Sequence, residues 1–421
     1  MSQSTVPQQP IALDPAGRDL HGEADRLRQR GCAALVELPD GIRAWAPTQY
    51  DVLKQLLADE RVSKDPNQHW PAWIDGEFRE TWVNSWVGVT NMFTAYGSNH
   101  RRLRKLVSPA FTKRRTDALR PRIEELTAGL LDRMAEAEAE AEADDEGDGG
   151  GGSVDLRAAY AHPLPMQVIC ELFGLPEDRQ ADTARLVESI MDTTATPEQA
   201  AATWQEVHQL LAGLVALKRA EPGDDMTTVL IAARDEEGSA LTEAELIDTL
   251  LLVIAAGHET TVNLIGNAVH ALLSHPEQLA RVLSGEVPWS DVIEETLRYA
   301  PSIANLPLRY AVSDIELPDG TVIAQGDAIL AAYGAAGRDP QRHGATAGQF
   351  DIGRVDKGHI AFGHGVHYCM GAPLARLEAG VALPALFSRF PGLRLDPGAG
   401  GALPVGSFIA DGFAALPVRL K

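Results

Sequence analysis

The sequence predicts a mainly α-helical protein that carries small β-sheets. Its longest helical stretch runs from Thr242 to Ser274, where Thr242 and Glu245 match a capping box and Ser274-His-Pro ends the pattern. At 1.5 Å per residue this helix crosses the full width of a domain of this size. Other helical patterns cover residues 48–57, 92–111, 123–143, 166–173, 178–221, 291–299 and 370–390. Short strand patterns cover residues 34–38, 42–45, 309–312, 315–320, 322–323, 328–332 and 416–418.

The length, charge, cysteine content and apolar runs of the chain exclude several classes of protein. The chain has 421 residues and a formal net charge of −22, which argues against nucleic acid as a partner. Its three cysteines are too few and too scattered for a disulfide framework, so we expect a reducing cytoplasm. The N-terminus has no basic start followed by an apolar run, and the apolar run at 250–257 is far too short to span a bilayer. We therefore expect no membrane attachment.

An aromatic-rich, irregular segment spans residues 62–92. It holds four of the seven tryptophans, Trp70, Trp73, Trp82 and Trp86. Such a loop either covers a core or forms a lid over an apolar ligand pocket, and both interpretations stay open.

The helix expected at 92–111 has an apolar stripe that includes Leu103, Leu106 and Val107. Its other face is basic: residues 100–122 hold nine Lys and Arg against Asp117 as the one acidic residue. A charge run of this kind is usually a solvated face. Here the local excess of positive charge stands out because the whole chain is strongly acidic.

The centre of the longest helix is unusually polar. Ala256-Gly-His-Glu-Thr-Thr261 follows an apolar run, although a buried helix disfavours such groups. A threonine in a helix can hydrogen-bond to a carbonyl one turn earlier and bend the helix. The block is therefore either a kink with satisfied polar groups or a functional site.

A single cysteine follows two glycines in Phe362-Gly-His-Gly-Val-His-Tyr-Cys369-Met-Gly371 and precedes a helical pattern. A thiolate at a helix N-terminus lies among unpaired N–H groups, which lower its pKa and make it a metal ligand. Glycines let the backbone approach a flat cofactor. The alternative is a buried structural cysteine. Pro384 falls inside the following helix and is expected to kink it or end it early.

The pattern F-x-x-G-x-x-x-C-x-G resembles the haem-ligand loop of the cytochrome P-450 superfamily, in the form of its soluble bacterial branch. Three further motifs resemble the same family in the same order: His100-x-x-x-Arg104, the A-G-x-[D/E]-T-T block at 256–261, and Glu295-x-x-Arg298. Ala95-Tyr-Gly-Ser-Asn99 before His100 resembles a small actinobacterial subgroup. The resemblance implies a cytochrome P-450 fold, with residues 1–20 as a polar arm, residues 21–421 as a single haem domain and 143–153 as a flexible acidic, Gly-rich loop.

The resemblance also implies roles for individual residues. Cys369 is expected to ligate the iron of haem b, and Phe362, Gly363 and Gly371 to shape the ligand loop. Glu259 and Thr260 are expected to form the acid–alcohol pair that delivers protons for oxygen activation. His100, Arg104, Arg309 and His367 are expected to bind the haem carboxylates, and Glu295, Arg298 and Arg354 to form a structural triad. The expected pocket residues are Trp86, Met92, Val253, Ala256, Ile303, Ala304, Leu306 and Phe408.

We therefore expect a haem-thiolate monooxygenase that inserts one oxygen atom of O2 into a C–H bond of an apolar small molecule. Steroids, macrolactones and terpenoids are candidate substrates, with a slight preference for steroids. Electrons are expected from a ferredoxin and its reductase, with the ferredoxin docking on the basic residues at 100–122, and the protein is expected to be monomeric. The alternatives are a peroxide-using or isomerising haem-thiolate enzyme and a non-catalytic haem protein for electron transfer or gas sensing.

Overall fold

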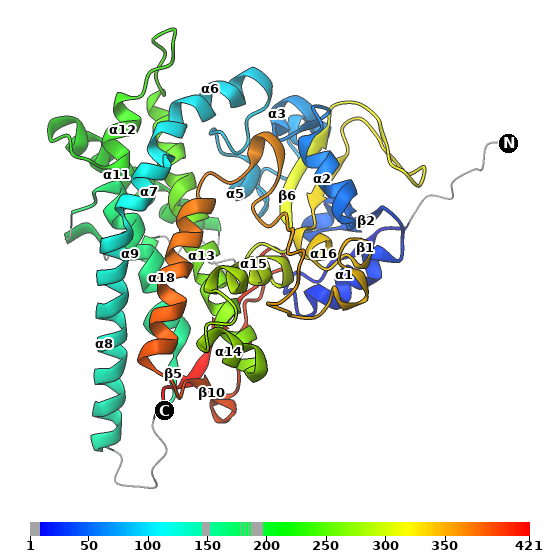
Figure 1. The fold of residues 1–421 in the computed structure, drawn as a ribbon. Helices are drawn as coiled ribbons and strands as arrows, with labels where there is room; N and C mark the ends of the chain where they lie inside the picture. Colours follow the sequence, from blue (N-terminus) through cyan, green and yellow to red (C-terminus); the bar gives the residue numbers. More distant parts are fainter. Residues whose placement is uncertain (1–8, 145–151, 177, 181, 184, 187–196) are drawn as a thin grey trace.

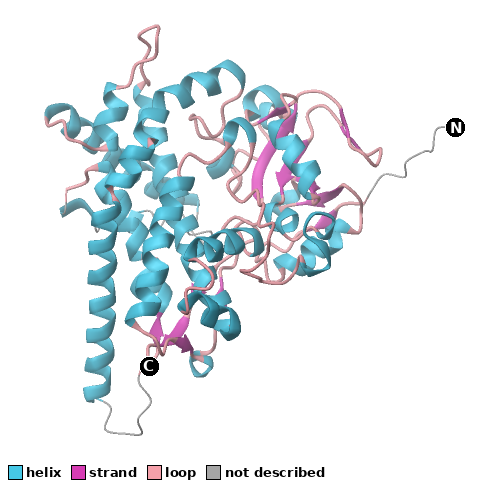
Figure 2. Ribbon diagram, in the orientation of Figure 1, coloured by secondary structure: helices cyan, strands magenta, loops and turns pink. Residues whose placement is uncertain are grey.

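We describe a computed structural model of the chain for residues 9–144, 152–176, 178–180, 182–183, 185–186 and 197–421. Long helices make up one side of the molecule, and the largest sheet with several short helices makes up the other (Figures 1 and 2). The prediction of a mainly α-helical fold with small sheets is confirmed. The loop expected at 143–153 lies mostly outside the described residues.

The largest sheet has six strands in the order β1-β2-β3-β9-β6-β4. Its edge strand β4 pairs antiparallel with β6, with Ser63 opposite Tyr310. The first strand, β1, runs parallel to β2, so part of the expected N-terminal arm instead joins the sheet. The six strands are β1 (Ile11–Ala12), β2 (Ala33–Glu37), β3 (Arg43–Pro47), β4 (Val62–Ser63), β6 (Leu306–Ala311) and β9 (Ala328–Ala331). The smaller sheets contain β5 (Val154–Asp155), β7 (Ile315–Glu316), β8 (Val322–Ile323), β10 (Arg394–Leu395), β11 (Leu403–Pro404), β12 (Phe413–Ala415) and β13 (Pro417–Arg419).

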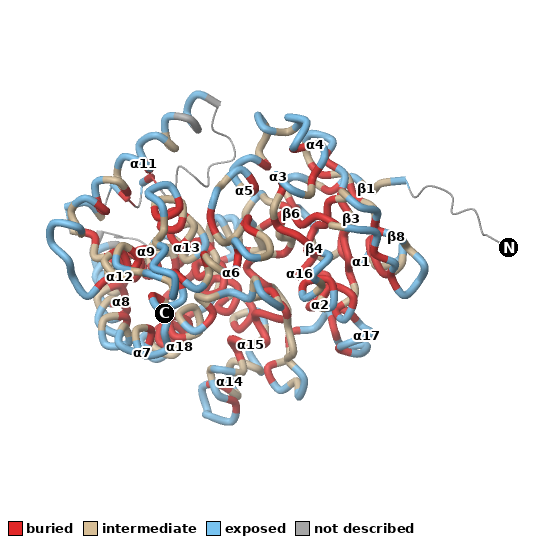
Figure 3. Tube along the Cα trace, turned by 90° about the horizontal axis from the view of Figure 1, so that it is seen from above, coloured by how far each residue is buried: buried red, intermediate tan, exposed pale blue. Residues whose placement is uncertain are grey.

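The central helix is α13 (Glu243–Ser274), which runs through the most buried part of the molecule (Figure 3). The expected capping box is present: the Thr242 hydroxyl accepts from the Glu245 N–H, and the Glu245 carboxylate accepts from the Thr242 N–H. Within the described ranges α13 is the one helix long and apolar enough to cross a membrane, and 72% of its apolar window is buried. That burial is typical of a core helix.

Several helices and a π-helical turn pack against α13. The contacts of α13 with α9, α15, α18 and the turn at Arg157–Ala161, together with α8 packed on α18 and α9, form the largest apolar core. Gly257 lets α9 approach closely, because a Cβ there would lie 3.3 Å from Ile169 Cδ1. The longer helices are α6 (Gly97–Val107), α8 (Arg120–Asp144), α9 (Pro163–Phe173), α11 (Pro197–Ala220), α15 (Trp289–Tyr299) and α18 (Ala372–Arg389). The shorter ones are α1 (Leu20–Arg28), α2 (Tyr50–Ala58), α3 (Pro66–His69), α4 (Pro71–Ile74), α5 (Asn84–Val87), α7 (Lys113–Ala118), α12 (Met226–Ala232), α14 (Pro276–Leu283), α16 (Tyr333–Gly337) and α17 (Pro340–His343).

Helix α18 continues past Pro384 to Arg389, so the expectation of an early end is wrong, and a kink at Pro384 stays a prediction. A proline inside a helix costs about 3 kcal/mol relative to alanine. Around Pro384, however, Leu383, Leu386 and Phe387 are buried in the main core. Apolar burial of about 2 kcal/mol for each such side chain exceeds the cost of the proline.

Candidate active site

The segment before α18 forms a tight loop that presents Cys369. The Cys369 N–H donates to the Phe362 carbonyl at 2.9 Å, which closes the loop. Gly363 and Gly365 have φ values of 73° and 71°, a region that favours glycine. Gly365 also touches α2, since a Cβ there would lie 2.6 Å from the Leu57 carbonyl oxygen. The loop leaves Cys369 exposed, so a ligand can reach its sulfur.

The pKa of the Cys369 thiol is raised, whereas the sequence predicted that it is lowered. Burial among protein atoms is the largest cause and raises the pKa. The N–H groups of Gly371 and Ala372 and the guanidinium of Arg104 act in the expected direction but are outweighed. Although Cys369 is solvent-accessible, the protein atoms packed around its sulfur therefore outweigh the helix end and raise the pKa of the metal-free thiol.

Ion pairs fix the ligand loop to α15. The Arg376 guanidinium donates to both Glu294 carboxylate oxygens at 2.6 and 2.9 Å, and His359 contacts the same carboxylate at 3.0 Å. These partners lower the pKa of Glu294 to about 2, although burial opposes the shift. Arg376 also lies 4.6 Å from the ring centroid of Phe362, so one guanidinium orders the ring beside the cysteine.

Basic side chains from three separate segments converge beside this loop. His100 and Arg104 come from α6, Arg309 from β6 and His367 from the cysteine loop. The His100 and His367 rings are 4.1 Å apart, and Arg104 donates to the Tyr368 carbonyl at 2.8 Å. Burial, with help from the neighbouring arginines, lowers the pKa of His100 to about 4 and lowers that of His367 as well. Both imidazoles are therefore neutral at pH 7.

Two atoms of this basic group are buried and make no hydrogen bond, namely His100 Nε2 and Arg309 Nε. Buried polar atoms are rarely left without partners, and buried cations need anions. The group also includes Lys64, which is 2% exposed and which the sequence analysis did not single out. A lone lysine after a two-residue strand carries no pattern in the sequence that would identify it.

The predicted acid–alcohol pair lies at the middle of α13. The Thr260 hydroxyl donates to the Ala256 carbonyl at 2.6 Å, which confirms the expected bond to the preceding turn. Its oxygen can still accept a hydrogen bond. Glu259 is buried, and its carboxylate oxygens lie 3.0 and 3.1 Å from Arg157 Nη2. The sequence analysis missed Arg157, because it comes from the π-helical turn about 100 positions earlier.

The predicted structural triad is assembled in the core. Arg298 Nε and Nη2 donate to the two Glu295 oxygens at 2.8 and 2.7 Å, with both side chains fully buried. Arg354 Nε reaches Glu295 at 3.4 Å. The remaining Arg298 donors bind the carbonyls of Gly337 and Ala347, so the triad ties α15 to the segment that leads to the cysteine loop.

Comparison with known proteins agrees with this arrangement. The family model described as cytochrome P-450 matches residues 166–284 and 289–397. A 2-hydroxy-5-methyl-1-naphthoate 7-hydroxylase from Streptomyces carzinostaticus is 45% identical, and the alignment covers 98% of each chain.

The chain belongs to the cytochrome P-450 family.

Solved P-450 structures superpose closely on the chain. CYP154A1 from Streptomyces coelicolor A3(2) is 51% identical, with a TM-score of 0.88 over 98% of this chain and 100% of that one. The complex described as "Testerone bound CYP154C4", from Streptomyces sp. ATCC 11861, is 43% identical, with a TM-score of 0.89 over 98% and 99%. The protein is thus a haem-dependent P-450 monooxygenase, an oxidoreductase.

The residues present fit haem b. Haem carries two carboxylates, and the structure offers a basic group with unused buried donors beside an exposed cysteine. Ala256 is also exposed although it lies mid-way along the central helix, so protein side chains do not cover that face of α13. These features match what a flat, dianionic, thiolate-ligated cofactor requires.

The residues predicted to line the substrate pocket of this P-450 fall into two groups. Met92 and Val253 belong to the apolar cluster of α9, α11 and α13. Trp86, Ile303 and Phe408 belong to the cluster beside the large sheet, where Phe408 meets Trp82 edge to face at 5.3 Å. Ala304 is buried just before β6, and Leu306, the first residue of β6, is half-buried.

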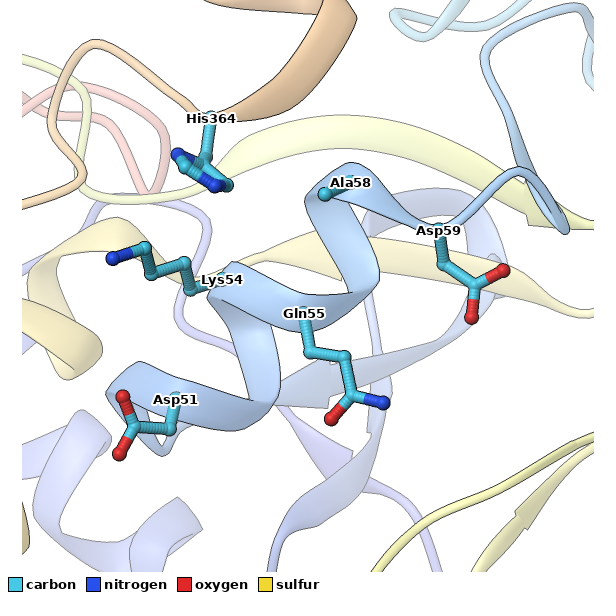
Figure 4. A pocket seen from close by; sticks show the side chains of 6 residues that line it. All are labelled: Asp51, Lys54, Gln55, Ala58, Asp59 and His364. Carbon is cyan, nitrogen blue, oxygen red and sulfur yellow. The ribbon is translucent and has the colours of Figure 1, made fainter.

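A surface hollow of about 460 Å³ lies elsewhere, between α2 and the cysteine loop (Figure 4). Its lining is polar, so it does not suit an apolar substrate of this P-450. The lining residues are Asp51, Lys54, Gln55, Ala58, Asp59 and His364.

Proposed function

We propose that Cys369 is the thiolate ligand of the haem iron and that His100, Arg104, Arg309 and His367 bind the haem carboxylates. The observation that carries this assignment is the convergence of basic side chains, with orphaned buried donors, on the loop that exposes the cysteine. The haem supplies O2 binding and oxidation when bound. The protein supplies the ligand, the charge balance, the protons and the substrate orientation.

In this proposal Thr260 and Glu259 deliver protons to the reaction centre. The Thr260 hydroxyl is held by Ala256 and keeps free lone pairs that can hold a water molecule. The Glu259 carboxylate contacts Arg157, so it must rotate away from that guanidinium before it can carry a proton inward. The Arg157 guanidinium thereby compensates the charge of the buried carboxylate between turnovers.

We propose a flat, polycyclic, apolar substrate, with steroids as one candidate class. Apolar and aromatic residues from the tryptophan-rich segment, α13 and the 303–308 and 405–412 segments support this choice. The names of two similar proteins point the same way, one naming a naphthoate and one described as bound to testerone. Macrolactones and terpenoids are larger or less planar, and they stay as alternatives.

We propose that electrons come from a ferredoxin and its reductase through the basic surface of α6 and α7. Most of these basic residues are paired with carboxylates: Arg102 with Glu245, Lys105 with Glu236 and Arg115 with Asp224. Exposed ion pairs of this kind contribute about 0–1 kcal/mol to stability. The basic side chains can therefore leave these carboxylates and pair with carboxylates of a docking ferredoxin. Arg104 ties this surface to the cysteine loop through the Tyr368 carbonyl.

We also propose that residues 21–421 form one haem domain and that the protein is a cytoplasmic monomer. The net charge of −22 supports solubility, and the shared core of α8, α13 and α18 supports a single folding unit. Size-exclusion chromatography with light scattering would show a mass near 45.2 kDa plus haem, and a dimer mass would contradict the monomer.

The proposal is tested by absorption spectra of the dithionite-reduced protein with CO, for wild type and Cys369→His. We expect a strongly red-shifted Soret band in the wild type and its loss in the variant, because only a thiolate ligand gives that shift. His208→Gln, on the exposed surface of α11 and away from the loop, is the control and should keep the band. The same ordinary band in wild type and Cys369→His would reject the ligand assignment.

A further inference from the structure

Lys64 is a buried cation that no carboxylate neutralises among the described residues. It is 2% exposed and directly follows β4. Its ammonium lies 3.4 Å from the Pro307 carbonyl oxygen and 3.5 Å from the ring centroid of Phe93. An ammonium has three donors, so one carbonyl and one ring do not satisfy it. A buried charged lysine is stabilised by an anion, and no carboxylate in the described part of the chain pairs with Lys64.

The strand pairing directs Lys64 toward a second cation. Val62 pairs with Ala311 and Ser63 with Tyr310 in the antiparallel ladder, so the next residue, Lys64, extends toward Arg309. The two side chains interact electrostatically, and burial followed by the charge of Arg309 lowers the pKa of Lys64 well below its ordinary value. Like charges across a strand pair are unfavourable, and here both are buried.

Basic side chains from three separate elements gather in this part of the molecule. Lys64 follows β4, Arg104 lies on α6 and Arg309 on β6, and all three act electrostatically on His367. The haem carboxylates supply two negative charges, which would offset the repulsion between the buried Lys64 and Arg309 side chains.

We propose that Lys64 is a further haem-binding residue, whose ammonium pairs with a haem carboxylate beside Arg309. This inference rests on the proposed position of the carboxylates at His100, Arg104, Arg309 and His367. It also links the cofactor to the segment before α6, because the same ammonium lies over Phe93. The Phe93 N–H donates to the Asn91 side chain, which in turn donates to the Asp248 carbonyl on α13.

Haem release and haem reduction potential in purified holoenzyme test the proposal. Lys64→Met keeps the length of the side chain and removes its charge, and Lys64→Arg restores the charge. Lys113→Met removes one positive charge from an exposed lysine on α7 and is the matched control. Haem release is followed as transfer to excess apomyoglobin, and the potential is measured with dyes and dithionite, so no substrate or ferredoxin is needed.

We expect Lys64→Met to release haem roughly tenfold faster, because a partly buried ion pair is lost. Its reduction potential should be more negative, since a positive charge near the haem favours the reduced form. Lys64→Arg should stay within about threefold of wild type in release, and Lys113→Met should match wild type in both measurements.

Release at the wild-type rate from Lys64→Met would overturn the proposal. Faster haem release at an unchanged reduction potential would also overturn it, because a general loosening of the fold would speed haem release without changing the potential. If Lys64→Met does not fold, the carboxylate bending modes in resonance Raman spectra of wild type and Lys64→Arg decide: a shift supports the pairing and identical modes refute it. A wild type without the thiolate CO band would instead reject the proposed haem site on which this inference rests.

Discussion

At the scale of single residues, the pairing of Glu259 with Arg157 distinguishes the two members of the acid–alcohol pair. Thr260 is bonded within its own helix, whereas Glu259 is held from outside by a side chain of the π-helical turn. A buried carboxylate without a partner would cost several kcal/mol, so the arginine is needed for folding as well. The neighbouring Thr261 bonds to the Gly257 carbonyl at 3.1 Å and is buried.

Thr260→Ala is expected to uncouple oxygen consumption from product formation. The loss of the hydroxyl removes the group that we propose holds protons at the reaction centre, so the yield of hydroxylated product per O2 consumed should fall about tenfold or more. Thr261→Ala is the control, since it removes a similar back-bond on the buried side of α13. The measurement is product and hydrogen peroxide per O2 consumed; an unchanged yield in Thr260→Ala would remove Thr260 from the proposed mechanism.

At the scale of elements, α18 carries the cysteine loop at its start and a buried acid in its interior. Glu378 is 2% exposed, and its Oε2 has no hydrogen-bond partner. Burial raises its pKa from 4.5 to about 8. The neutral, protonated carboxyl of Glu378 is therefore stable in this buried helix interface, whereas the ionised carboxylate is unfavourable there.

The stability of the protein should decrease between pH 4.5 and 8 because of Glu378. The folded-state pKa is raised, so the stabilisation is full below the unfolded pKa and is lost as pH rises through about 8. The loss of stability corresponds to roughly 5 kcal/mol. Glu378→Gln should flatten this part of the pH profile in chemical denaturation, whereas the exposed Glu277→Gln should follow wild type. If the free energies of unfolding of wild type and Glu378→Gln change in parallel with pH, Glu378 ionises in the folded protein without loss of stability.

At the scale of the whole molecule, a protein of net charge −22 concentrates exposed positive charge beside its cysteine loop. Arg101 and Arg114 are exposed on α6 and α7, and the basic residues that pair with carboxylates of other segments are Arg102, Lys105 and Arg115. An acidic partner is therefore attracted to this surface and repelled by most others.

Arg101→Glu and Arg114→Glu should each raise the KM for ferredoxin about threefold to tenfold and weaken the dependence of turnover on ionic strength. Arg43→Glu, an equal charge change at the exposed first residue of β3, should have little effect. Haem content and the CO spectrum should stay normal in all three variants. Equal effects at Arg43 and Arg101 would indicate a response to net charge rather than to a docking surface.

The sequence by itself determined the family, the long central helix and the residues of the four motifs. These features are local: the capping box, the back-bonding threonine and the Glu295–Arg298 pair each depend on residues within one or two turns. Only the tertiary structure decided the partners that come from far along the chain. Arg157 reaches Glu259, Lys64 approaches Arg309, and Arg376 holds Glu294.

The same reason explains the two expectations that the structure corrected. Helix α18 continues past Pro384, and the pKa of Cys369 is raised, because burial outweighs the local effects of a proline ring and a helix end. Burial is a property of the packed molecule, to which segments distant in sequence contribute. A sequence pattern reports the local preference but not how deeply the residue will lie.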